Sequence, residues 1–569
     1  MEWQWIYKPV PNETSVNQLA EAINVNPALA TLLAQRGITT YDTAKAFFRP
    51  SLDRLPDPFG MADLHKAVDR LVSAVSNEEK ILFYGDYDVD GTTSVALMMS
   101  FFQEYYPQIL YYIPDRYAEG YGLSLAGVDY ARKEGVKLLI TLDCGIKAHE
   151  PIAQANAWGM DVMVCDHHRP EGELPPAHAV LNPQRPDCPY PSTELSGCGV
   201  GFKLLQGFCL QQGLDLNEHL YPLLDLVTIA IAADIVPIKN ENRILAHYGL
   251  QAMNVQMRPG VKARVELAGM STPISISDVV FYLAPRINAA GRLAHAHDAV
   301  KLFLSTKTEE AQRRAQALHD KNQERKQVDQ SITQEALAML AQQEERNSTV
   351  LFKDDWHKGI IGIVASRCIE HHYRPTIILT ESNRKATGSA RSVAGFDIYE
   401  ALHECADLLD QFGGHTYAAG MTLPLENVPK LQARFEEVVA NTITPEAQTP
   451  QLEIDLELPL AFITDKFYRI LKQMAPFGPA NPEPILVSHN LTLGSAPRLL
   501  KEKHLKMSVT TADPQVGHLE AIGFNMAEYF PLLKTGDPFS MAYTLQENTW
   551  RGETSLQLRI KDIRIESLS

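Results

Sequence analysis

Short apolar runs alternate with longer amphipathic segments between residues 80 and 182, and the apolar runs have the length of buried strands. They are KILFYG (80–85), QILYYI (108–113), KLLITL (137–142), DVMVC (161–165) and AVLN (179–182). The segments that separate them are long enough for helical crossovers between parallel strands. The alternation therefore predicts a doubly wound parallel sheet with helices on both faces, within an α/β domain that we place at residues 76–305.

Two further regions have helical rather than strand-like patterns. Residues 16–38, VNQLAEAINVNPALATLLAQRGI, carry apolar side chains at helical spacing and end near a glycine, so residues 1–75 are predicted to form a helical lead-in. Residues 308–343 are rich in charge and contain no glycine or proline, which predicts one long helix within a connecting region at 306–347. At 1.5 Å per residue this helix would span roughly 55 Å, enough to separate two domains.

The C-terminal part of the chain predicts two more domains. A strand-like STVLFKD, a helix-like IIGIVASRCIEHH and a strand-like PTIILT indicate a second α/β domain at residues 348–441. TITPEAQTPQ (442–451) has the composition of a linker. Alternating strands such as HLKMSVTTA, HLEAIGFN and TSLQLRIKDIRIE then predict a small β-barrel similar to an OB-fold at residues 446–569.

Charge and composition restrict the class of protein. A formal net charge of −17 disfavours a general polyanion binder, because its repulsion would slow the approach of a phosphate backbone. Local basic grooves are still compatible with the sequence, since APRINAAGRLAH (284–295) and RKATGSAR (384–391) carry cations and no acid. With 45% hydrophobic and 21% charged residues, the chain has the composition of a globular protein.

The sequence predicts neither a secreted nor a membrane-bound protein. The start, MEWQWIYKPV, lacks the charged and apolar regions of a signal peptide. The longest apolar stretch, YPLLDLVTIAIAADIVPI (221–238), contains two aspartates and two prolines, which disfavours a membrane span. Seven cysteines without a C-x-x-C pair favour reduced thiols over disulfides or zinc ribbons. We therefore predict a cytoplasmic location and no membrane partner.

Three aspartates alternate in YGDYDVDGTTS (84–94), directly after the first apolar run. Asp86, Asp88 and Asp90 would repel one another unless a cation neutralised them. An EF-hand calcium loop would need a glutamate at its twelfth position, which is Leu97, and a helix where the chain has a strand. Helix capping could account for Asp90 but not for all three acids. The triplet therefore predicts a metal site of another type.

Further ligand candidates follow the neighbouring apolar runs. Asp143 ends the third run, and Asp166, His167 and His168 end the fourth. Because ligand sites of doubly wound sheets lie beyond the carboxyl ends of the strands, these side chains are expected to meet the triplet there. Asp234 lies in TIAIAADIVPI, where we expect a buried carboxylate that needs a cation or a hydrogen-bonding partner.

The types of donor indicate the metal and the reaction. Aspartates mixed with histidine and without cysteine suit Mn²⁺ or Mg²⁺ better than structural zinc. The candidate ligands outnumber those that one catalytic ion takes from a protein, so two ions about 3.5 to 4 Å apart are expected. Such a pair activates water and holds phosphoryl oxygens during in-line displacement, which predicts hydrolysis of a phosphoester.

Longer motifs then show a family resemblance. DYDVDG, TLDCGI, VCDHHRP and AADIVPI, in this order, resemble the motifs of the DHH phosphoesterases. FYLAPRINAAGRL, WHKGIIGIVASRC, SARSVAGFDIYEAL and QFGGHTYAAG are similar to those of the RecJ family, bacterial exonucleases that degrade single-stranded DNA from 5′ to 3′. The resemblance covers nearly the whole chain from about residue 50. It implies a DHH domain, a DHH-associated domain and an OB-like barrel, and a two-metal exonuclease of recombination and DNA repair that works with a helicase and a single-strand-binding protein.

The resemblance also implies roles for individual residues. Five match metal-ligand positions: Asp88, Asp90, Asp143, His167 and Asp234. Asp86 and His168 adjoin the site as catalytic residues, with His168 facing the scissile phosphate. The positions around the substrate are Arg116, Ser389 and Arg391 at the 5′ phosphate, Arg286 and Arg292 along the strand, and Gly413, Gly414 and His415 of the GGH motif. In that motif the glycines would allow close backbone approach, and His415 would contact phosphate and take part in catalysis. Taken alone, GGH would fit a helix stop, and the arginines would fit solvated surface positions.

Several alternatives stay open. Asn288, Asn322, Arg325, Trp356 and His357 match family motifs without an assigned chemistry, and His357 fits a structural role as well. Phe539, Tyr543 and Trp550 could stack bases or form the barrel core. Within the wider family, a hydrolase of short oligonucleotides or cyclic dinucleotides is one alternative to the exonuclease. A catalytically inactive scaffold, like that of the eukaryotic replicative helicase, is another, although every ligand position is filled here.

Overall fold

The computed structural model describes residues 3–293, 296–344, 346–513, 517–550 and 552–566, with the backbone alone for 289–293 and 550. The chain divides into two compact units. The terminal unit consists of Met1–Arg49, Ile332–Ala475 and Pro482–Ser569, and the central unit consists of Pro50–Ser331 and Pro476–Asn481. Among the described helices, none has the length together with the apolar character that crossing a membrane takes.

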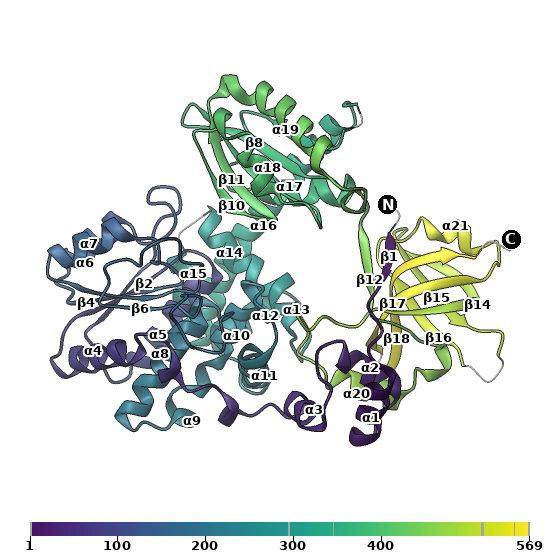
Figure 1. The fold of residues 1–569 in the computed structure, drawn as a ribbon, viewed down its shortest axis with the longest axis horizontal. Helices are drawn as coiled ribbons and strands as arrows, with labels where there is room; N and C mark the ends of the chain where they lie inside the picture. Colours follow the sequence, from purple (N-terminus) through teal and green to yellow (C-terminus); the bar gives the residue numbers. More distant parts are fainter. Residues whose placement is uncertain (1–2, 294–295, 345, 514–516, 551, 567–569) are drawn as a thin grey trace. The chain divides into compact units, whose positions relative to one another are not determined.

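The central unit contains the parallel sheet that the sequence predicts (Figure 1). Its strands are β2 (Ile81–Gly85), β3 (Ile109–Tyr112), β4 (Leu138–Leu142), β5 (Asp161–Cys165) and β6 (Ala179–Leu181). All of them pair in parallel, in the order β3-β2-β4-β5-β6. The order reverses between β2 and β4, and such a reversal opens a crevice at the carboxyl ends of the strands. The predicted doubly wound fold is confirmed.

Helices cover both faces of this sheet: α4 (Leu64–Ser76), α5 (Val89–Phe102) and α8 (Gly197–Gln212) lie on one face, and α6 (Leu125–Lys133) and α7 (His149–Ala157) on the other. Successive strand residues point to opposite layers. Ile81 and Phe83 pack with α4, α5 and α8, whereas Leu82 and Tyr84 pack with α6 and α7. Because both faces are buried, the strands are continuous apolar runs rather than alternating ones.

The rest of the central unit is helical. Its elements are α9 (Leu216–His219), α10 (Leu224–Ala233), α11 (Asn240–Val255), α12 (Pro259–Leu267), α13 (Ile276–Asp278), the π-helix η4 (Val279–Leu283), α14 (Ala284–Leu293) and α15 (His297–Phe303). The predicted long helix is α16 (Thr308–Leu340), whose 33 residues span roughly 50 Å. Its residues up to Ser331 belong to the central unit and the others to the terminal unit.

The N-terminal segment differs from the predicted helical lead-in at 1–75. It begins with a strand, β1 (Gln4–Tyr7), followed by α1 (Glu13–Ile23), α2 (Pro27–Ala34) and α3 (Tyr41–Phe48). β1 pairs in parallel with β12 (Gln451–Ile454), and the buried Trp5 donates its indole N–H to Asp562 at 2.7 Å. Residues up to Arg49 therefore belong to the terminal unit, whereas α4 is part of the core of the central unit. A four-residue strand is too short for periodicity to reveal it.

The second α/β domain lies in the terminal unit. Its elements are β7 (Thr349–Phe352), α17 (Ile361–His371), β8 (Thr376–Ser382), β9 (Lys385–Arg391), α18 (Ile398–His403), β10 (Gln411–His415), β11 (Ala418–Leu423) and α19 (Val428–Thr442). The strands form one sheet in the order β10-β11-β9-β8-β7. Only β7 and β8 pair in parallel; the other pairs are antiparallel.

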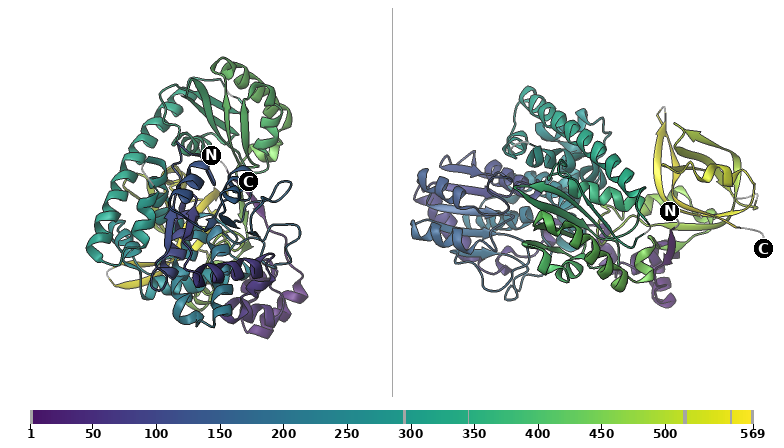
Figure 2. Two further views of the ribbon diagram at one scale, coloured as in Figure 1. Left: turned by 90° about the vertical axis from the view of Figure 1, so that its left-hand side faces the viewer. Right: turned by 90° about the horizontal axis from the view of Figure 1, so that it is seen from above.

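The predicted barrel is also present, and its strands can be followed in yellow in Figure 2. They are β13 (Leu456–Glu457), β14 (Leu486–Leu500), β15 (His504–Thr510), β16 (Leu519–Gly523), β17 (Phe539–Trp550) and β18 (Glu553–Ile565). The order is β13-β14-β15-β16-β18-β17, and an additional pairing of β14 with β17 closes the sheet. Two helices accompany it, α20 (Asp465–Lys472) and α21 (Tyr529–Leu533). Closure leaves no open edge among the five long strands.

Candidate metal centre

The candidate metal ligands come from segments that end at the crevice of the central sheet. Asp86 follows β2, Asp143 follows β4 and Asp166 follows β5, each directly after the last residue of its strand. Asp234 is the C-cap of α10. Because parallel strands end at the same edge, side chains that are far apart in the sequence meet here, as predicted.

The three aspartates after β2 have different surroundings. Asp88 is the N-cap of α5, and its carboxylate accepts a hydrogen bond from a backbone N–H three residues on, at 3.0 Å. Asp90 is 1% exposed and accepts from the N–H groups of Gly197 and Cys198 at the start of α8, at 2.7 and 2.8 Å. Asp86 is also 1% exposed, and neither of its carboxylate oxygens has a well-formed hydrogen bond to another described residue. Capping thus accounts for Asp88 and not for Asp90, because α5 begins directly after Asp88.

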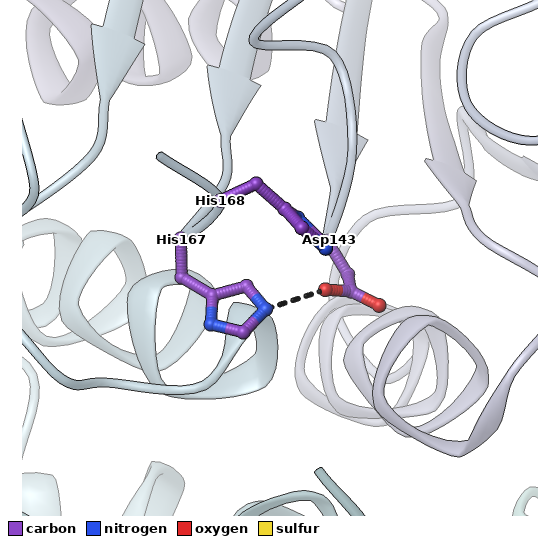
Figure 3. A group of neighbouring side chains, drawn as sticks. All are labelled: Asp143, His167 and His168. Atoms are coloured by element: carbon purple, nitrogen blue, oxygen red, sulfur yellow. Dashed lines mark ion pairs between the residues drawn. The ribbon is translucent and has the colours of Figure 1, made fainter. Parts of the chain in front are cut away.

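His167 lies at the centre of the remaining donors. Its Nε2 atom is 3.1 Å from Oδ1 of Asp143, 3.6 Å from Oδ2 of Asp234 and 3.9 Å from Oδ2 of Asp90. Figure 3 shows the imidazole directed at the Asp143 carboxylate. Both facing atoms are buried, and neither makes a hydrogen bond in the part of the chain that the structure describes. A bound cation would stabilise such a group of an imidazole nitrogen and three carboxylates.

Asp234 is less buried than its apolar sequence context predicts. The expectation of a buried carboxylate is wrong, since this side chain is 31% exposed. The apolar residues before it lie in α10 and are buried, but the helix ends at Ala233 and Asp234 follows as the cap. The carboxylate nevertheless faces His167, so the residue keeps its place among the candidate ligands.

Asp166 positions the histidine pair instead of adding to the group of ligand atoms. Its Oδ1 atom lies 2.7 Å from Nδ1 of His168 and accepts the backbone N–H of His167, and its Oδ2 atom accepts the N–H of Ile146 at 2.9 Å. Burial lowers the pKa of His168, but the hydrogen bond and charge of Asp166 outweigh this effect and raise that pKa to about 9. In the metal-free site His168 is therefore positively charged at neutral pH.

Tyr121 and the start of α8 are parts of the site that the sequence does not single out. The Tyr121 hydroxyl lies 3.0 Å from Nε2 of His168 and donates to the carbonyl oxygen of Asp143 at 3.2 Å. A Cβ on Gly197 would lie 2.5 Å from Cβ of Asp143, so only glycine allows α8 to begin this close to the carboxylates. The glycine-rich run LSGCGVG (195–201) is the sequence signal for this approach.

The donor set fits Mn²⁺ or Mg²⁺. Three groups of side chains each place ligand atoms within 4.8 Å of one another: Asp86, Asp88 and Asp143; Asp90, His167 and Asp234; and Asp143, His167 and His168. Burial and neighbouring carboxylates raise the pKa of Asp86 to about 8 and the pKa values of Asp90 and Asp234 to about 7. Without a cation the cluster resists full ionisation, and oxygen-rich sites of this kind suit hard divalent ions.

These raised pKa values predict how the metal-free protein responds to pH. Between about pH 4 and pH 8, folded Asp86, Asp90 and Asp234 retain protons that unfolded aspartates, with a pKa of 3.8, have lost. The folded state then binds more protons than the unfolded state, so the free energy of unfolding should fall as the pH rises through this window. Thermal unfolding in EDTA should show the matching fall in melting temperature.

Mn²⁺ is the control for this prediction. Because the ion favours the deprotonated carboxylates, saturating Mn²⁺ should raise the melting temperature most at the alkaline end of the window. An equal rise at every pH would contradict the coupling between the metal and these carboxylates.

The central unit contains three arginines that are predicted to bind the substrate, and the structure describes the side chains of two of them. Arg116 is partly exposed, its guanidinium carbon lies 4.8 Å from the centroid of the Tyr87 ring, and its charge opposes the rise in the Asp86 pKa. It therefore adjoins the metal cluster. Arg286 is only 8% exposed, so a solvated surface position is wrong for it. The Arg292 side chain lies outside the described residues.

In the terminal unit, Ser389 and Arg391 lie on one face of β9, as their alternation predicts. Nη1 of Arg391 donates to Oγ of Ser389 at 3.1 Å, and burial lowers the pKa of this guanidinium. Both side chains face the first turn of α17, because a Cβ on Gly362 would lie 2.9 Å from Oγ of Ser389 and 3.0 Å from Nη2 of Arg391. A guanidinium, a hydroxyl and a helix N-terminus together make an anion-binding arrangement. The sequence does not reveal the part that Gly362 plays in it.

The GGH motif ends a strand rather than a helix. Gly413, Gly414 and His415 are the last residues of β10, and all three are exposed. A Cβ on Gly414 would lie 2.3 Å from the carbonyl oxygen of Ala418, so the tight connection between β10 and β11 requires glycine at this position. The helix-stop interpretation is therefore wrong, and the contact of His415 with phosphate stays a prediction.

Other motif residues have structural surroundings. Trp356 is 4% exposed, and its indole N–H donates to the Glu335 carboxylate at 3.0 Å. Nδ1 of His357 accepts a backbone N–H two residues on, at 3.1 Å, which fits a structural role. Asn322 and Arg325 are buried on α16. Asn288 is partly exposed on α14.

Three aromatic residues of the barrel are candidates for base stacking, and the structure describes the side chains of two of them. Phe539 is 1% exposed and Tyr543 is 0% exposed, and the Tyr543 hydroxyl bonds to Ser488 at 2.7 Å. Both side chains therefore form the core and are closed to bases. The side chain of Trp550 lies outside the described residues.

Models of known protein families match three parts of the chain. The DHH family, N-terminal domain matches residues 80–231, the DHHA1 domain matches 325–441 and the RecJ OB domain matches 454–562. The first match contains the strands and most of the candidate ligands, the second contains β9 and the GGH motif, and the third contains the barrel.

Relatives match along nearly the whole chain. The single-stranded-DNA-specific exonuclease RecJ of Bacillus subtilis (strain 168) is 38% identical over 560 residues, which cover 98% of this chain and 70% of that protein. The exonuclease of the same name from Escherichia coli (strain K12) is 35% identical over 560 residues, which cover 94% of this chain and 96% of that protein.

Solved structures agree with the sequence relatives. The crystal structure of RecJ from Thermus thermophilus in complex with Mn²⁺ has a TM-score of 0.84 and 27% identity, and covers 99% of this chain and 80% of that chain. The complex of the same protein with Mg²⁺ has a TM-score of 0.78 and 26% identity, and covers 99% and 79%. Since full-length relatives and three domain models coincide on one chain, this chain belongs to the RecJ family within the DHH proteins.

Proposed function

We propose that the chain is a metal-dependent exonuclease that degrades single-stranded DNA from its 5′ end. The observation that supports this most directly is the cluster of donors at the crevice of the central sheet, formed by Asp86, Asp88, Asp90, Asp143, His167 and Asp234. The relatives are single-stranded-DNA-specific exonucleases by name, and the two structures of RecJ from Thermus thermophilus contain Mn²⁺ or Mg²⁺. Two ions bound by the cluster would activate water and stabilise the charge that develops on the phosphate.

The side chains of the cluster would then have separate roles. The proposed ligands are Asp88, Asp90, Asp143, His167 and Asp234. Asp86, whose buried oxygens have no well-formed hydrogen bond among the described residues, would orient the attacking water. His168, held by Asp166, would donate a hydrogen bond to an oxygen of the scissile phosphate.

Recognition of the strand end would come from other residues. Ser389 and Arg391 on β9 are proposed to bind the terminal 5′ phosphate, because a guanidinium group and a hydroxyl suit its extra negative charge. For Arg116, beside the metal cluster, the family resemblance supports the same role. Gly413, Gly414 and His415 would approach the backbone of the strand from an exposed hairpin. The proposed setting is recombination and repair of DNA in the cytoplasm, where a helicase would supply single strands and a single-strand-binding protein would hold them.

A nuclease assay separates this proposal from the two alternatives. In Mn²⁺, a long 5′-phosphorylated single strand should be shortened from its 5′ end, whereas the same sequence as a blunt duplex should resist. A preference for dinucleotides or cyclic dinucleotides over long strands would favour the short-substrate hydrolase. Absence of turnover with every substrate and with both Mn²⁺ and Mg²⁺ would favour the inactive scaffold.

The barrel carries an exposed aromatic that the sequence does not single out. Phe524 is 49% exposed, and its ring lies 5.3 Å from the His504 ring and 5.4 Å from the guanidinium carbon of Arg559. It borders a pocket of about 270 Å³ that Lys561 and Trp3 also line. An exposed ring beside cations is suited to stacking a base next to its phosphate.

Phe524→Ala should therefore weaken binding of long single strands by about 1 to 3 kcal/mol, the contribution of one stacked base. Hydrolysis of a very short strand should be unchanged, and Phe462→Ala, which removes another exposed ring of the terminal unit, is the control. Equal effects of the two variants, measured by fluorescence anisotropy, would refute the assignment. Deleting the barrel would be a poorer test, because β12 pairs with β1 and residues 476–481 belong to the central unit.

A further inference from the structure

Four donor side chains that belong to none of the metal-ligand groups lie on three helices of the central unit. Arg264 on α12 is 1% exposed, and its Nη1 donates to the carbonyl oxygen of Ala315 on α16 at 2.8 Å. Arg286 on α14 is 8% exposed, and its Nη1 donates to the carbonyl oxygen of Tyr282 at 2.6 Å. His319 and Asn322 lie on α16 one turn apart.

The remaining donors of this group have no partner in the described part of the chain. These atoms are Nε and Nη2 of Arg264, Nε of Arg286, Nδ1 of His319 and Nδ2 of Asn322, and all of them are buried. Buried polar atoms of folded proteins are nearly always hydrogen-bonded, and a buried charge is normally paired. Several unpaired donors in one place therefore point to a ligand that accepts hydrogen bonds.

The charges around the group also point to an anion. Burial and the charge of Arg286 lower the pKa of Arg264 to about 10, so both guanidinium groups stay protonated at neutral pH. Burial and the positive charges of Arg264 and Arg286 lower the pKa of His319. The charge of Lys326 adds to this effect, and the charge of Asp320 opposes it. Two buried positive charges thus lie near each other, and no carboxylate forms an ion pair with either in the described residues.

The surface next to Arg286 indicates the source of this anion. Arg286 follows the π-helix η4, and its guanidinium carbon lies 5.8 Å from the centroid of the Tyr282 ring. Tyr282 is 46% exposed, and the neighbouring Phe281 is 71% exposed. Exposed rings beside an arginine are typical of surfaces that stack the bases of a single strand. A phosphate of that strand could then reach the unpaired donors.

We propose that Arg264, Arg286, His319 and Asn322 form a binding site for one phosphate group, which shares no residue with the metal centre. Guanidinium groups match the tetrahedral oxygens of phosphate, and the imidazole and amide donors would satisfy the remaining lone pairs. The phosphate belongs either to a bound DNA strand or to free inorganic phosphate or a mononucleotide. The first source rests on the proposed nuclease function; the site itself does not.

Thermal unfolding of the full chain in EDTA tests the site without turnover. Inorganic phosphate should raise the melting temperature of the wild type above its value in chloride of equal ionic strength. Arg264→Gln should reduce this rise to less than about half, and Arg286→Gln, on another helix, should do the same. Both variants should fold, because each removes an unpaired buried charge. Arg313→Gln, an exposed position on α16, should keep the full rise.

Strand binding then identifies the source of the phosphate. A fluorescent oligothymidylate with a 5′ hydroxyl, in EDTA, should bind Arg264→Gln roughly tenfold more weakly than wild type if the site takes a strand phosphate. Unchanged strand affinity with a reduced phosphate effect would assign the site to free phosphate. An undiminished phosphate-dependent rise in both variants would overturn the proposal. None of these results depends on nuclease activity, so they leave the proposed function to its own assay.

Discussion

Replacing Asp143 by asparagine is expected to lower the turnover of single-stranded DNA by about 100-fold or more in Mn²⁺, with little change in strand affinity. Asp143 is 2% exposed and belongs to two of the three donor groups, so we propose that its carboxylate would help to hold both ions. Strand affinity should persist because the variant removes none of the cationic side chains that hold phosphate. Asparagine is the suitable replacement, since Asp143 has a φ of 61°, and asparagine adopts such backbone angles readily.

The stability of the same variant gives a second measurement. In EDTA, Asp143→Asn should be at least as stable as the wild type, because it removes a carboxyl group whose ionisation is opposed by burial and by the neighbouring carboxylates. The stabilisation that Mn²⁺ gives the wild type should be largely lost. Asp129→Asn, on α6 and paired with Lys133, is a control that should keep both turnover and metal stabilisation. Turnover above a few per cent of wild type in Asp143→Asn would show that this carboxylate does not bind the ions.

The place of the metal site in the fold could be predicted from the sequence, because it depends on strand ends. Buried parallel strands leave continuous apolar runs, and the residue after each run falls at one edge of the sheet. Asp86 and Asp143 therefore lie where expected. The surroundings of each donor depend on contacts that the pattern does not contain. Asp166 has the same strand-end signal but bonds to His168, and Asp234 lies at a helix end, which leaves it partly exposed.

Contacts between distant segments were the least predictable part of the fold. The pairing of β1 with β12 joins the start of the chain to the segment that precedes the barrel strands, and neither strand carries a pattern that identifies its partner. The aromatic residues of the barrel show the same limit. Phe539 and Tyr543 in β17 are buried, whereas Phe524 directly after β16 is exposed, and only the closed sheet distinguishes them.

The polarity of degradation needs a feature that recognises one end of the strand, since two ions alone meet the same phosphodiester from either direction. Arg391→Ala should lower kcat/KM on 5′-phosphorylated single strands by about 2 to 3 kcal/mol, the value of a charged hydrogen bond. The physical reason is the arrangement on β9, where Arg391 and Ser389 share a hydrogen bond and face the N-terminal turn of α17 across Gly362. Burial lowers the pKa of this guanidinium, so a phosphate dianion would restore the interactions that it lost with water.

Strands with a 5′ hydroxyl serve as the second substrate of a thermodynamic cycle that compares wild type and Arg391→Ala. On them Arg391→Ala should have a much smaller effect, because the terminal phosphate that the side chain would bind is missing. Arg391→Lys should fall between wild type and alanine, since it keeps the charge but loses the planar pair of donors. Arg384→Ala, an exposed arginine in the turn before β9, should leave both substrates unaffected. Equal losses on phosphorylated and hydroxyl strands would mean that Arg391 binds the strand elsewhere and that another group sets the polarity.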